Sequence, residues 1–468
     1  MKGIESMRKV VRFEVNGLFG YADHSVDFRT SAPTILTAPN GAGKTHILTL
    51  LNASLSLDVQ TLLTTTFSSL RVDLTDGRSL LVVRETTPPF ETGLAISTIL
   101  AGIPIGNTLR VDTRMLESLE PTLPSHLKPS GPSRWLDTRT GRVLNREGVE
   151  RRFRVKFGLS NEILDNNPEL RDLCAKPYPV LIDTKRLDLA GLDRSPSLDY
   201  STAHTLRDES GAASRIHEYT EQLRSEVTEA RRGSIHATQS ADVSFAARAL
   251  AAARKTVRET DLHERYDRTV ERYEALARNS LAVGEAPIPF PDKTTPTDRR
   301  ILNVFLDDWD KRLEPLLPLN EKIQTLRDIL DSKLEPSGKT TAMSPRGGLE
   351  FRGFSGARIR VANLSSGEQH LVALFTMLLF SAQAGSLVLI DEPEISLHAG
   401  WKHAFLDDIS RVATIGSLQI VLATHSTGII NGRWDLTEEL KLSASRGSFA
   451  TASVADRLEE DDNDDIDS

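Results

Sequence analysis

The segment Ala38–Thr45 contains the residue types best suited to chemistry in this sequence, Ala-Pro-Asn-Gly-Ala-Gly-Lys-Thr. It matches the pattern G-x-x-x-x-G-K-[ST], with Ala at the first position. A loop that wraps phosphates with its backbone N–H groups needs glycine, because side chains would block the approach, and Gly41 and Gly43 meet that need. The residues expected to bind ATP here are Asn40, Gly41, Ala42, Gly43, Lys44, Thr45 and His46.

Lys44 and Thr45 are expected to play distinct parts in such a loop. The Lys44 ammonium would pair with the β- and γ-phosphates of ATP, and the Thr45 hydroxyl would be a ligand of Mg²⁺. The flanking residues predict a strand over Thr34–Thr37 and a helix over 46–57 whose positive end faces the phosphates. A glycine-rich turn that binds nothing is the alternative, and this strand–loop–helix context argues against it.

A second candidate site follows the apolar run at 387–390, which ends in Asp391 and Glu392. Such a run predicts a buried parallel strand that delivers two carboxylates to its C-terminal edge, where α/β proteins bind ligands. Asp391 would hold Mg²⁺, and Glu392 would polarise an attacking water. Because apolar strands often end in Asp, this pattern is informative only together with the loop at 38–45.

Two further motifs come in the second half of the chain. Residues 363–369, Asn-Leu-Ser-Ser-Gly-Glu-Gln, contain the capping pattern Ser365-x-x-Glu368 and predict a helix start that is also an anion site. An apolar strand over 418–423 then ends in Thr-His-Ser, and its His425 comes 33 residues after Glu392. A lone His after a strand is usually an ordinary residue, so its place in this order of motifs is what makes it a candidate.

Taken together, these motifs resemble those of ABC-type ATPases. Residues 363–369 resemble the signature LSGGQ, with Ser at the first Gly and Glu inserted before Gln, and 393–398 resemble the D-loop. The resemblance implies that His425 is the switch histidine and, with Glu392, orders the water, and that Lys44 with Ser365 stabilises the developing charge. The signature residues implied to act on the nucleotide of another subunit are Ser365, Ser366, Gly367 and Glu368.

The spacing of the motifs narrows the resemblance. Lys44 and Ser365 are 321 residues apart, a layout similar to the split heads of the SMC, RecF and OLD (overcoming lysogenisation defect) ATPases. Residues 391–398, Asp-Glu-Pro-Glu-Ile-Ser-Leu-His, resemble OLD and related bacterial antiphage-defence ATPases. Residues 434–440 resemble the ATPase partners in two-component defence systems of the PARIS and Septu types.

The resemblance also implies partners. A signature that acts in another subunit implies a homodimer or higher homo-oligomer with head-to-head ATP sites. Only 43 residues follow His425, so a nuclease domain within this chain is not expected, and the effector would be a separately encoded Toprim-like or HNH nuclease. Two other functions stay open: a RecF- or SMC-like DNA-repair ATPase, and an ATP-dependent dimerisation switch with little turnover.

One position departs from the pattern of related ATPases. There, a strand equivalent to 180–182 leads into a loop whose Gln approaches Mg²⁺, and here Lys185 stands at the corresponding position. Slow or partner-dependent hydrolysis is one interpretation. A misaligned loop is the other, and the sequence favours neither.

The expected fold is an α/β ABC-type P-loop ATPase head, split into two lobes, with an antiparallel β subdomain and an inserted helical arm. Two strands flanking the turn at Asp76-Gly77 predict the β subdomain, and apolar residues at helical spacing predict the arm, interrupted by the Pro-rich segment 287–291. The expected divisions are lobe 1 at 1–205, the helical insertion at 206–335, lobe 2 at 336–442 and an acidic, disordered tail at 443–468.

Composition excludes several classes. With 39% hydrophobic and 26% charged residues among 468, the chain is not wholly disordered. Its single cysteine, Cys174, excludes an internal disulfide framework and a multi-cysteine metal site, and it indicates the cytoplasm. The uncharged stretch 372–390 is interpreted as helix, turn and strand, because polar and glycine residues interrupt it, so no membrane association is expected.

The distribution of charge along the chain is compatible with DNA as a partner. The net charge is −8, but residues 456–468 hold eight acidic residues and one arginine, so residues 1–455 carry only −1. The predicted arm contains the basic pairs 231–232 and 254–255 among acidic residues. These pairs indicate either a DNA-binding surface or a solvated helix face.

Overall fold

The computed structural model describes most of the chain. The described residues are 8–39, 41–87, 91–112, 123–131, 134–139, 142–145, 161–174, 177–183, 211–252, 257–282, 284–395, 397–440 and 443–444. Asn40, Lys185, Ser396, the basic pair 254–255 and residues 445–468 lie outside them.

A parallel sheet of five strands forms the centre of the head, in the order β11-β15-β16-β3-β17. Its strands are β3 (Thr34–Thr37), β11 (Val180–Asp183), β15 (Leu387–Asp391), β16 (Gln419–Ala423) and β17 (Thr437–Glu439). Each paired neighbour runs parallel. Every residue of β15 and β16 is buried, which explains why these strands are apolar throughout instead of alternating. The predicted strands at 34–37, 180–182, 387–390 and 418–423 are therefore confirmed.

The two faces of this sheet bury different cores. Val388, Ile390 and Leu422 join the core formed with α12 (Ser366–Phe380) and α13 (Ala399–Gly416). Leu389 and Val421, which point to the opposite face, join the core formed with α1 (Lys44–Ser56). Because side chains alternate along a strand, one apolar strand serves both layers.

An antiparallel sheet of seven strands packs on the α1 side, in the order β18-β2-β1-β4-β5-β6-β7. Its strands are β1 (Val10–Leu18), β2 (Ala22–Asp27), β4 (Ser69–Leu74), β5 (Arg78–Thr87), β6 (Glu91–Leu100), β7 (Ile103–Asp112) and β18 (Ser443–Ala444). The predicted turn at Asp76-Gly77 joins β4 to β5, and Gly77 has a φ of 81°, which glycine adopts without strain. Two residues of the predicted tail, Ser443 and Ala444, pair with β2.

Smaller elements complete the head. They are α2 (Val59–Thr64), α5 (Asn161–Asp165), α6 (Pro168–Leu173), α14 (Thr427–Ile430), β8 (Leu127–Gly131), β9 (Arg134–Asp137), β10 (Arg142–Asn145), β12 (Thr340–Met343), β13 (Leu349–Arg352) and β14 (Arg358–Ile359). Strands β8–β10 and β12–β14 form two antiparallel sheets of three strands each.

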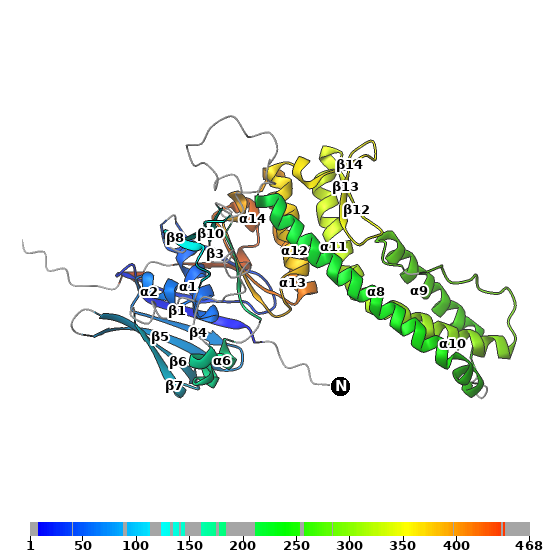
Figure 1. Cartoon of the computed structure of the whole chain (residues 1–468), viewed down its shortest axis with the longest axis horizontal. Helices are drawn as coiled ribbons and strands as arrows, with labels where there is room; N and C mark the ends of the chain where they lie inside the picture. The colour runs from blue at the N-terminus through cyan, green and yellow to red at the C-terminus, as the bar shows by residue number, and fades with distance from the viewer. Residues whose placement is uncertain are drawn as a thin grey trace, which may run out of the picture.

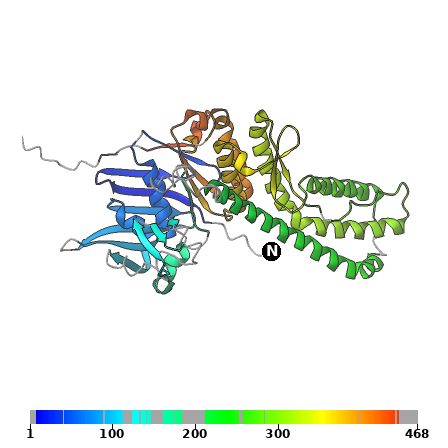
Figure 2. The same cartoon turned by 45° about the horizontal axis from the view of Figure 1, so that its top comes forward.

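Helices α8 (Gly211–Ala251), α9 (Glu259–Arg278) and α10 (Pro296–Leu313) extend from the head as an arm (Figures 1 and 2). The Pro-rich segment 287–291 lies between α9 and α10, as predicted, and Thr295 caps α10 through a capping box with Asp298. Helix α11 (Leu317–Leu334) returns to the head and packs on α12 and α13. The core on that face of the parallel sheet therefore continues into the base of the arm.

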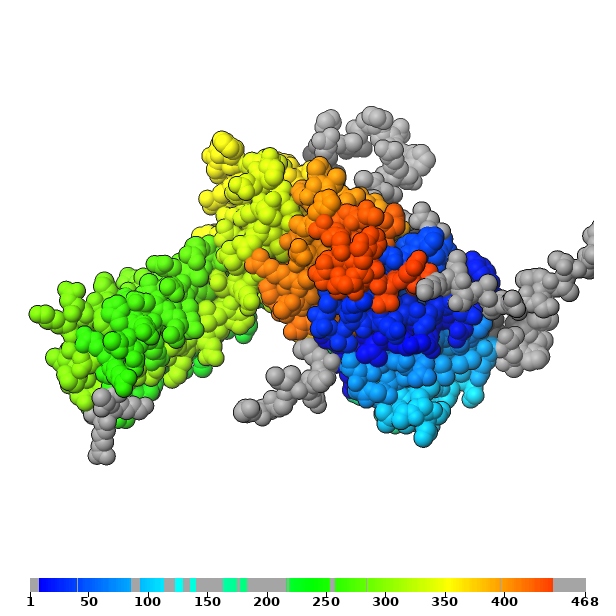
Figure 3. All heavy atoms as spheres, turned by 180° about the vertical axis from the view of Figure 1, so that it is seen from behind, coloured from blue at the N-terminus to red at the C-terminus, as the bar shows by residue number. Residues whose placement is uncertain are grey.

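The expected fold class is confirmed: a mixed α/β head with a parallel sheet, an antiparallel sheet and a helical arm. Seen from behind, the residues around 420–440 lie against the N-terminal strands (Figure 3), consistent with the pairing of β16 and β17 with β3. The stretch 372–390 forms the rest of α12, a turn and β15. Among the described residues, none of the helices has the length and hydropathy needed to cross a membrane. The four expected divisions of the chain stay predictions.

Candidate functional site

The loop before α1 has the backbone of a phosphate cradle. Gly41 and Gly43 have φ angles of 83° and 93°, a left-handed conformation that strains other residues. A Cβ at Gly43 would also lie 3.1 Å from the Leu18 Cδ2 atom. Gly43 is the N-cap of α1 and offers no side chain to its first-turn N–H groups, which leaves that helix start suited to an anion.

Lys44 is buried at the start of α1, with 7% of the residue exposed. Its Nζ atom donates to the carbonyl oxygens of Ala38, at 2.8 Å, and Pro39, at 3.5 Å. Both acceptors are neutral. A phosphate placed at this loop would offer the ammonium an anionic partner and a stronger, charge-assisted hydrogen bond.

Thr45 and Asp391 meet across 346 residues of sequence. The Thr45 Oγ1 atom donates to the Asp391 Oδ2 atom at 2.7 Å, because the start of α1 lies beside the end of β15. A hydroxyl and a carboxylate are hard oxygen donors of the kind that Mg²⁺ takes alongside phosphate oxygens. Within the described part of the chain, no group of three or more His, Cys, Asp and Glu residues could hold a metal, so Mg²⁺ here would depend on the nucleotide for further ligands.

Glu392 and His425 face each other at the same sheet edge. Glu392 has a φ of 46°, and its backbone N–H donates to the Ala423 carbonyl oxygen at 2.8 Å. Its Oε1 atom lies 3.9 Å from the Nδ1 atom of His425. A left-handed non-glycine residue stores strain that is often found at functional sites.

Glu394 is a site residue that the sequence analysis did not single out. Its Oε1 atom accepts hydrogen bonds from Thr424 Oγ1, at 2.7 Å, and from the His425 backbone N–H, at 3.2 Å. The same oxygen lies 3.6 Å from His425 Nδ1. A carboxylate three residues after Asp391, on a chain that continues from a buried strand, was the signal available in the sequence.

Aromatic side chains beside the loop were also missed. Phe19, in the β1–β2 turn, contacts the His46 ring edge-on with ring centroids 4.8 Å apart. Phe19 and Tyr21 are 37% and 54% exposed, so their faces are accessible next to the phosphate cradle. The glycine-bounded turn Gly-Leu-Phe-Gly-Tyr was the available signal, but only the contact of the β1–β2 turn with the start of α1 places it here.

The signature segment forms the predicted capping box. Ser365 Oγ accepts from the Glu368 backbone N–H at 3.3 Å, and the Ser365 N–H donates to Glu368 Oε2 at 2.7 Å. A third residue joins this cap, because Lys339 Nζ donates to both Glu368 oxygens, at 2.7 and 2.8 Å. Burial alone would raise the pKa of Glu368, but the hydrogen bonds from Lys339 and Ser365 outweigh it and hold the pKa below its usual value.

The sequence-predicted residues thus form two groups. Asp391, Glu392 and His425 lie at the C-terminal edge of the adjacent strands β15 and β16, and Lys44 and Thr45 lie at the start of α1, after the loop that follows β3. Among the described residues, no hydrogen bond or ion pair joins the signature segment 365–368 to the loop at 41–46.

The predicted role of Lys185 lies outside the described residues. Strand β11 pairs with β15 so that Asp183 lies beside Asp391. The chain therefore leaves β11 at the sheet edge that holds Asp391, and the role of Lys185 stays a prediction.

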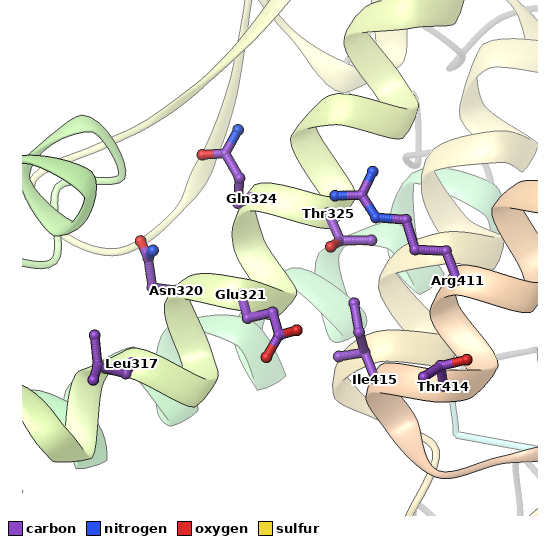
Figure 4. A pocket seen from close by; sticks show the side chains of 8 residues that line it. All are labelled: Leu317, Asn320, Glu321, Gln324, Thr325, Arg411, Thr414 and Ile415. Atoms are coloured by element: carbon purple, nitrogen blue, oxygen red, sulfur yellow. The ribbon is translucent and has the colours of Figure 1, made fainter. Parts of the chain in front are cut away.

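A shallow groove of about 510 Å³ lies elsewhere, between α11 and α13 (Figure 4). Its lining includes Asn320, Gln324 and Arg411, none of which belongs to the predicted site. Arg411 forms an ion pair with Asp328 at 2.9 Å across the two helices. The groove is a feature of the junction between arm and head and is separate from the phosphate loop.

Comparisons with known structures give similarities at low identity. The SMC head domain of Pyrococcus furiosus, with an extended coiled coil and bound to the C-terminal domain of ScpA, is 14% identical over 91% of each chain, with a TM-score of 0.37. The SMC head domain of Thermotoga maritima is 9% identical over 93% of this chain and 96% of that one, with a TM-score of 0.32. RecF bound to ATP is 10% identical over 91% and 95%, with a TM-score of 0.28.

No curated protein matches the chain. A family model described as "AAA domain, putative AbiEii toxin, Type IV TA system" matches residues 192–431, a range that includes Ser365, Asp391 and His425. The match spans more than half of the 468 residues. The chain therefore belongs to this family of AAA domains.

Proposed function

We propose that the protein is an ABC-type ATPase that binds and hydrolyses ATP and acts as a sensor or scaffold for a separately encoded effector in antiphage defence. The observation that carries the ATPase part is the contact between Thr45 Oγ1 and Asp391 Oδ2 at 2.7 Å. A hydroxyl after a phosphate-loop Lys and a carboxylate at a strand end meet in this way where Mg²⁺ and nucleotide are bound together.

Nucleotide binding follows from the loop. The first-turn N–H groups of α1 and the Lys44 ammonium would hold the β- and γ-phosphates, with Lys44 leaving the Ala38 carbonyl to which it donates. Thr45 and Asp391 would hold Mg²⁺, which when bound neutralises phosphate charge. The exposed ring of Phe19 or Tyr21 offers a face on which the adenine base could stack.

Hydrolysis would use the carboxylate and imidazole at the same edge. Glu392 would accept a proton from the attacking water, and the Nε2 atom of His425 would accept a hydrogen bond from the same water and hold it in place. Ser365 and the N-terminus of α12 would complete the site from a second copy of the chain, because Ser365 and Ser366 are exposed and no hydrogen bond or ion pair joins them to their own loop in the described structure. The active unit would then be a head-to-head dimer or a larger homo-oligomer.

The arm is a suitable transmitter of the nucleotide state. Helix α13 follows the segment 393–398. Its Asp408 forms an ion pair with Lys333 of α11, with the Asp408 Oδ2 and Lys333 Nζ atoms 2.6 Å apart. Both side chains are largely buried, at 5% exposure for Lys333 and 17% for Asp408, and the pair joins α13 to α11, which follows the arm helix α10 in the chain. A shift of 393–398 on ATP binding would therefore reach the arm.

The defence role rests on sequence resemblance and on the family. Residues 391–398 and 434–440 resemble defence ATPases, and the family description names an AbiEii toxin and a Type IV TA system. These observations support an ATPase whose output passes to a partner protein. Co-purification with the product of the neighbouring gene, with and without ATP, tests this part, and failure to co-purify in either condition would contradict it.

The ATPase part is tested by phosphate release from ATP and Mg²⁺ with purified wild-type protein and the Glu392→Gln variant. We expect the variant to lose at least about 100-fold in kcat and to keep its ATP affinity within about twofold, because the substitution removes a proton acceptor and leaves the phosphate loop intact. Glu264→Gln, at an exposed position of α9, is the matched control and should behave as wild type. Equal turnover in Glu392→Gln and wild type would contradict the role given to Glu392.

A further inference from the structure

We propose that Glu394 is a positioning residue that holds His425 in the orientation needed for ATP hydrolysis. The inference rests on the proposed function, because it deepens the account of the same site. It assigns two carboxylates to one histidine, Glu392 to act on water and Glu394 to hold the ring.

The backbone explains why Glu394 points inward. Strand β15 ends at Asp391, Glu392 takes the left-handed conformation, and Pro393–Ile395 form one turn of 3-10 helix. The Ile395 N–H donates to the Glu392 carbonyl oxygen at 3.2 Å and closes this turn. As a result Glu394 is 8% exposed, whereas the next residue, Ile395, is 49% exposed.

The Glu394 carboxylate connects the ends of the neighbouring strands β15 and β16 through hydrogen bonds. It extends from the turn after β15 and accepts hydrogen bonds from Thr424 Oγ1 and the His425 N–H, both just after β16. The Thr424 hydroxyl in turn accepts from the Ser426 N–H at 3.0 Å. The backbone at His425 is thereby fixed from both sides of the residue.

The buried Glu394 carboxylate needs a compensating partner, and the His425 imidazole is in a position to provide it. A buried carboxylate is costly unless donors or a cation compensate it. Its Oε2 atom has no hydrogen-bond partner among the described residues, while its Oε1 atom lies 3.6 Å from His425 Nδ1. That separation exceeds a hydrogen bond but is within reach of a small ring rotation. A proton held on Nδ1 by Glu394 leaves the Nε2 atom unprotonated and directed away from the carboxylate, where it can accept a hydrogen bond from the attacking water.

The two carboxylates near His425 differ in exposure. The Glu392 side chain is 21% exposed and the Glu394 side chain is 7% exposed. Water can therefore reach Glu392, whereas Glu394 makes its contacts inside the protein. This difference suits Glu392 to contact the attacking water and Glu394 to orient its neighbour.

The test is a double-mutant cycle on kcat. Glu394→Gln keeps the size of the side chain and an oxygen acceptor for Thr424 but removes the charge. We expect a loss of about tenfold or more in kcat with the ATP dissociation constant unchanged within about twofold. In a His425→Ala background the same substitution should have no further effect, because the residue it positions is absent.

The cycle separates this inference from a general structural role and from the proposed function. Equal losses in both backgrounds would overturn the inference, and so would an unchanged kcat in Glu394→Gln. Wild-type protein without ATPase activity would instead overturn the proposed function. If Glu394→Gln is unstable, Glu394→Asp serves in its place, and the same lack of additivity is expected.

A second readout needs no nucleotide. In protein with ¹⁵N-labelled histidine, the His425 resonances, assigned by their loss in His425→Ala, should report a proton on Nδ1. Glu394→Gln should move the proton toward Nε2, while Thr424→Val, which removes a hydroxyl but keeps the carboxylate, should leave the tautomer as in wild type. An unchanged tautomer in Glu394→Gln would contradict the inference.

Discussion

The sheet edge around Lys44 and the helix start at Ser365 differ in how their polar groups are satisfied. At the sheet edge, Lys44 donates only to neutral carbonyl oxygens in the contacts that the described structure gives it, and Glu394 keeps one carboxylate oxygen without a hydrogen-bond partner there. At the helix start, Glu368 accepts from Lys339, Ser337 and the Ser365 N–H. The first region has polar groups without charged or hydrogen-bonded partners among the described residues, whereas the Glu368 carboxylate in the second is fully hydrogen-bonded.

Because of this difference, we expect the two regions to have different functions. Groups that lack strong partners change their contacts when an anion arrives, so the sheet edge should respond directly to ATP. The side-chain network of Glu368 is already complete and can only support the helix. What the signature segment can offer a second copy is the exposed Ser365 and Ser366 and the N–H groups of the first turn.

Lys44→Ala tests the sheet edge and should have the largest effect. We expect ATP affinity to fall at least about 100-fold, or about 2.8 kcal/mol, because a charge-assisted contact to phosphate is lost. Isothermal titration calorimetry measures it, with Lys311→Ala on the exposed face of α10 as control. Normal affinity in Lys44→Ala would contradict the assignment of the phosphate loop.

Thr45→Val and Thr45→Ser separate the Mg²⁺ role of the hydroxyl from the packing of the side chain. Thr45→Val keeps the shape but removes the donor to Asp391, and we expect about tenfold more Mg²⁺ to be needed for nucleotide binding. Thr45→Ser should resemble wild type. The measurement is nucleotide binding at increasing Mg²⁺ concentration. Identical curves for the two variants would be evidence against the Thr45 hydroxyl as a Mg²⁺ ligand.

Ser365→Ala tests the helix start. The free energy of unfolding should fall by about 1 kcal/mol, because the helix loses its N-cap acceptor. Urea denaturation measures this, and Ser366→Ala, at the neighbouring exposed position, should change little. At protein concentrations where the copies are separate, ATP affinity should stay as in wild type, since no hydrogen bond or ion pair joins Ser365 to its own phosphate loop in the described structure. If Ser365→Ala lost ATP affinity but kept its free energy of unfolding, the assignment of a structural role to the Ser365 cap would be contradicted.

The pH dependence of stability should show the smallest effect. The lowered pKa of Glu368 means that the folded protein keeps this carboxylate ionised more readily than the unfolded chain, whose value is near 4.5. Its contribution is present above that pH and is lost as the pH falls through the lower folded value. The stability difference between wild type and Glu368→Gln, measured by thermal unfolding, should therefore shrink on acidification below about 4.5.

We expect the opposite pH dependence of stability for Asp408. Burial raises its pKa above 3.8 despite the ion pair with Lys333, so the folded protein binds this proton more readily than the unfolded chain. The stability of wild type relative to Asp408→Asn should grow as the pH falls through the raised value. The same direction of change for Glu368→Gln and Asp408→Asn would contradict these pKa shifts.

Much of the sheet edge could be predicted because its signals are local. The glycines at 41 and 43, the run that ends in Asp391 and the strand before His425 each follow from neighbouring residues. Parallel strands end at the same edge, so finding the three strands was enough to bring their ends together. The helices of the arm and the turn at Asp76-Gly77 were predictable for the same reason.

The parts that could not be predicted depend on packing between distant segments. Glu394 turns inward only because Glu392 adopts a left-handed conformation, which its residue type does not favour. Glu368 contacts Lys339 because the start of α12 lies beside the segment after α11, and Phe19 contacts His46 because the β1–β2 turn lies beside the start of α1. These contacts depend on tertiary structure, for which residue patterns along the chain carry no direct signal.

The central claim is that the two regions come from different copies and meet around ATP. The most direct test mixes two inactive variants, Lys44→Ala and Gly367→Asp. An Asp in the first turn of α12 suits the helix dipole but repels the γ-phosphate, so the second variant should fold normally and lack a working signature.

In a mixed dimer, the intact loop of Gly367→Asp faces the intact signature of Lys44→Ala. ATP hydrolysis by the mixture, measured as phosphate release, should therefore exceed that of either variant alone at the same total concentration. A mixture that stays as inactive as its components would contradict a shared ATP site.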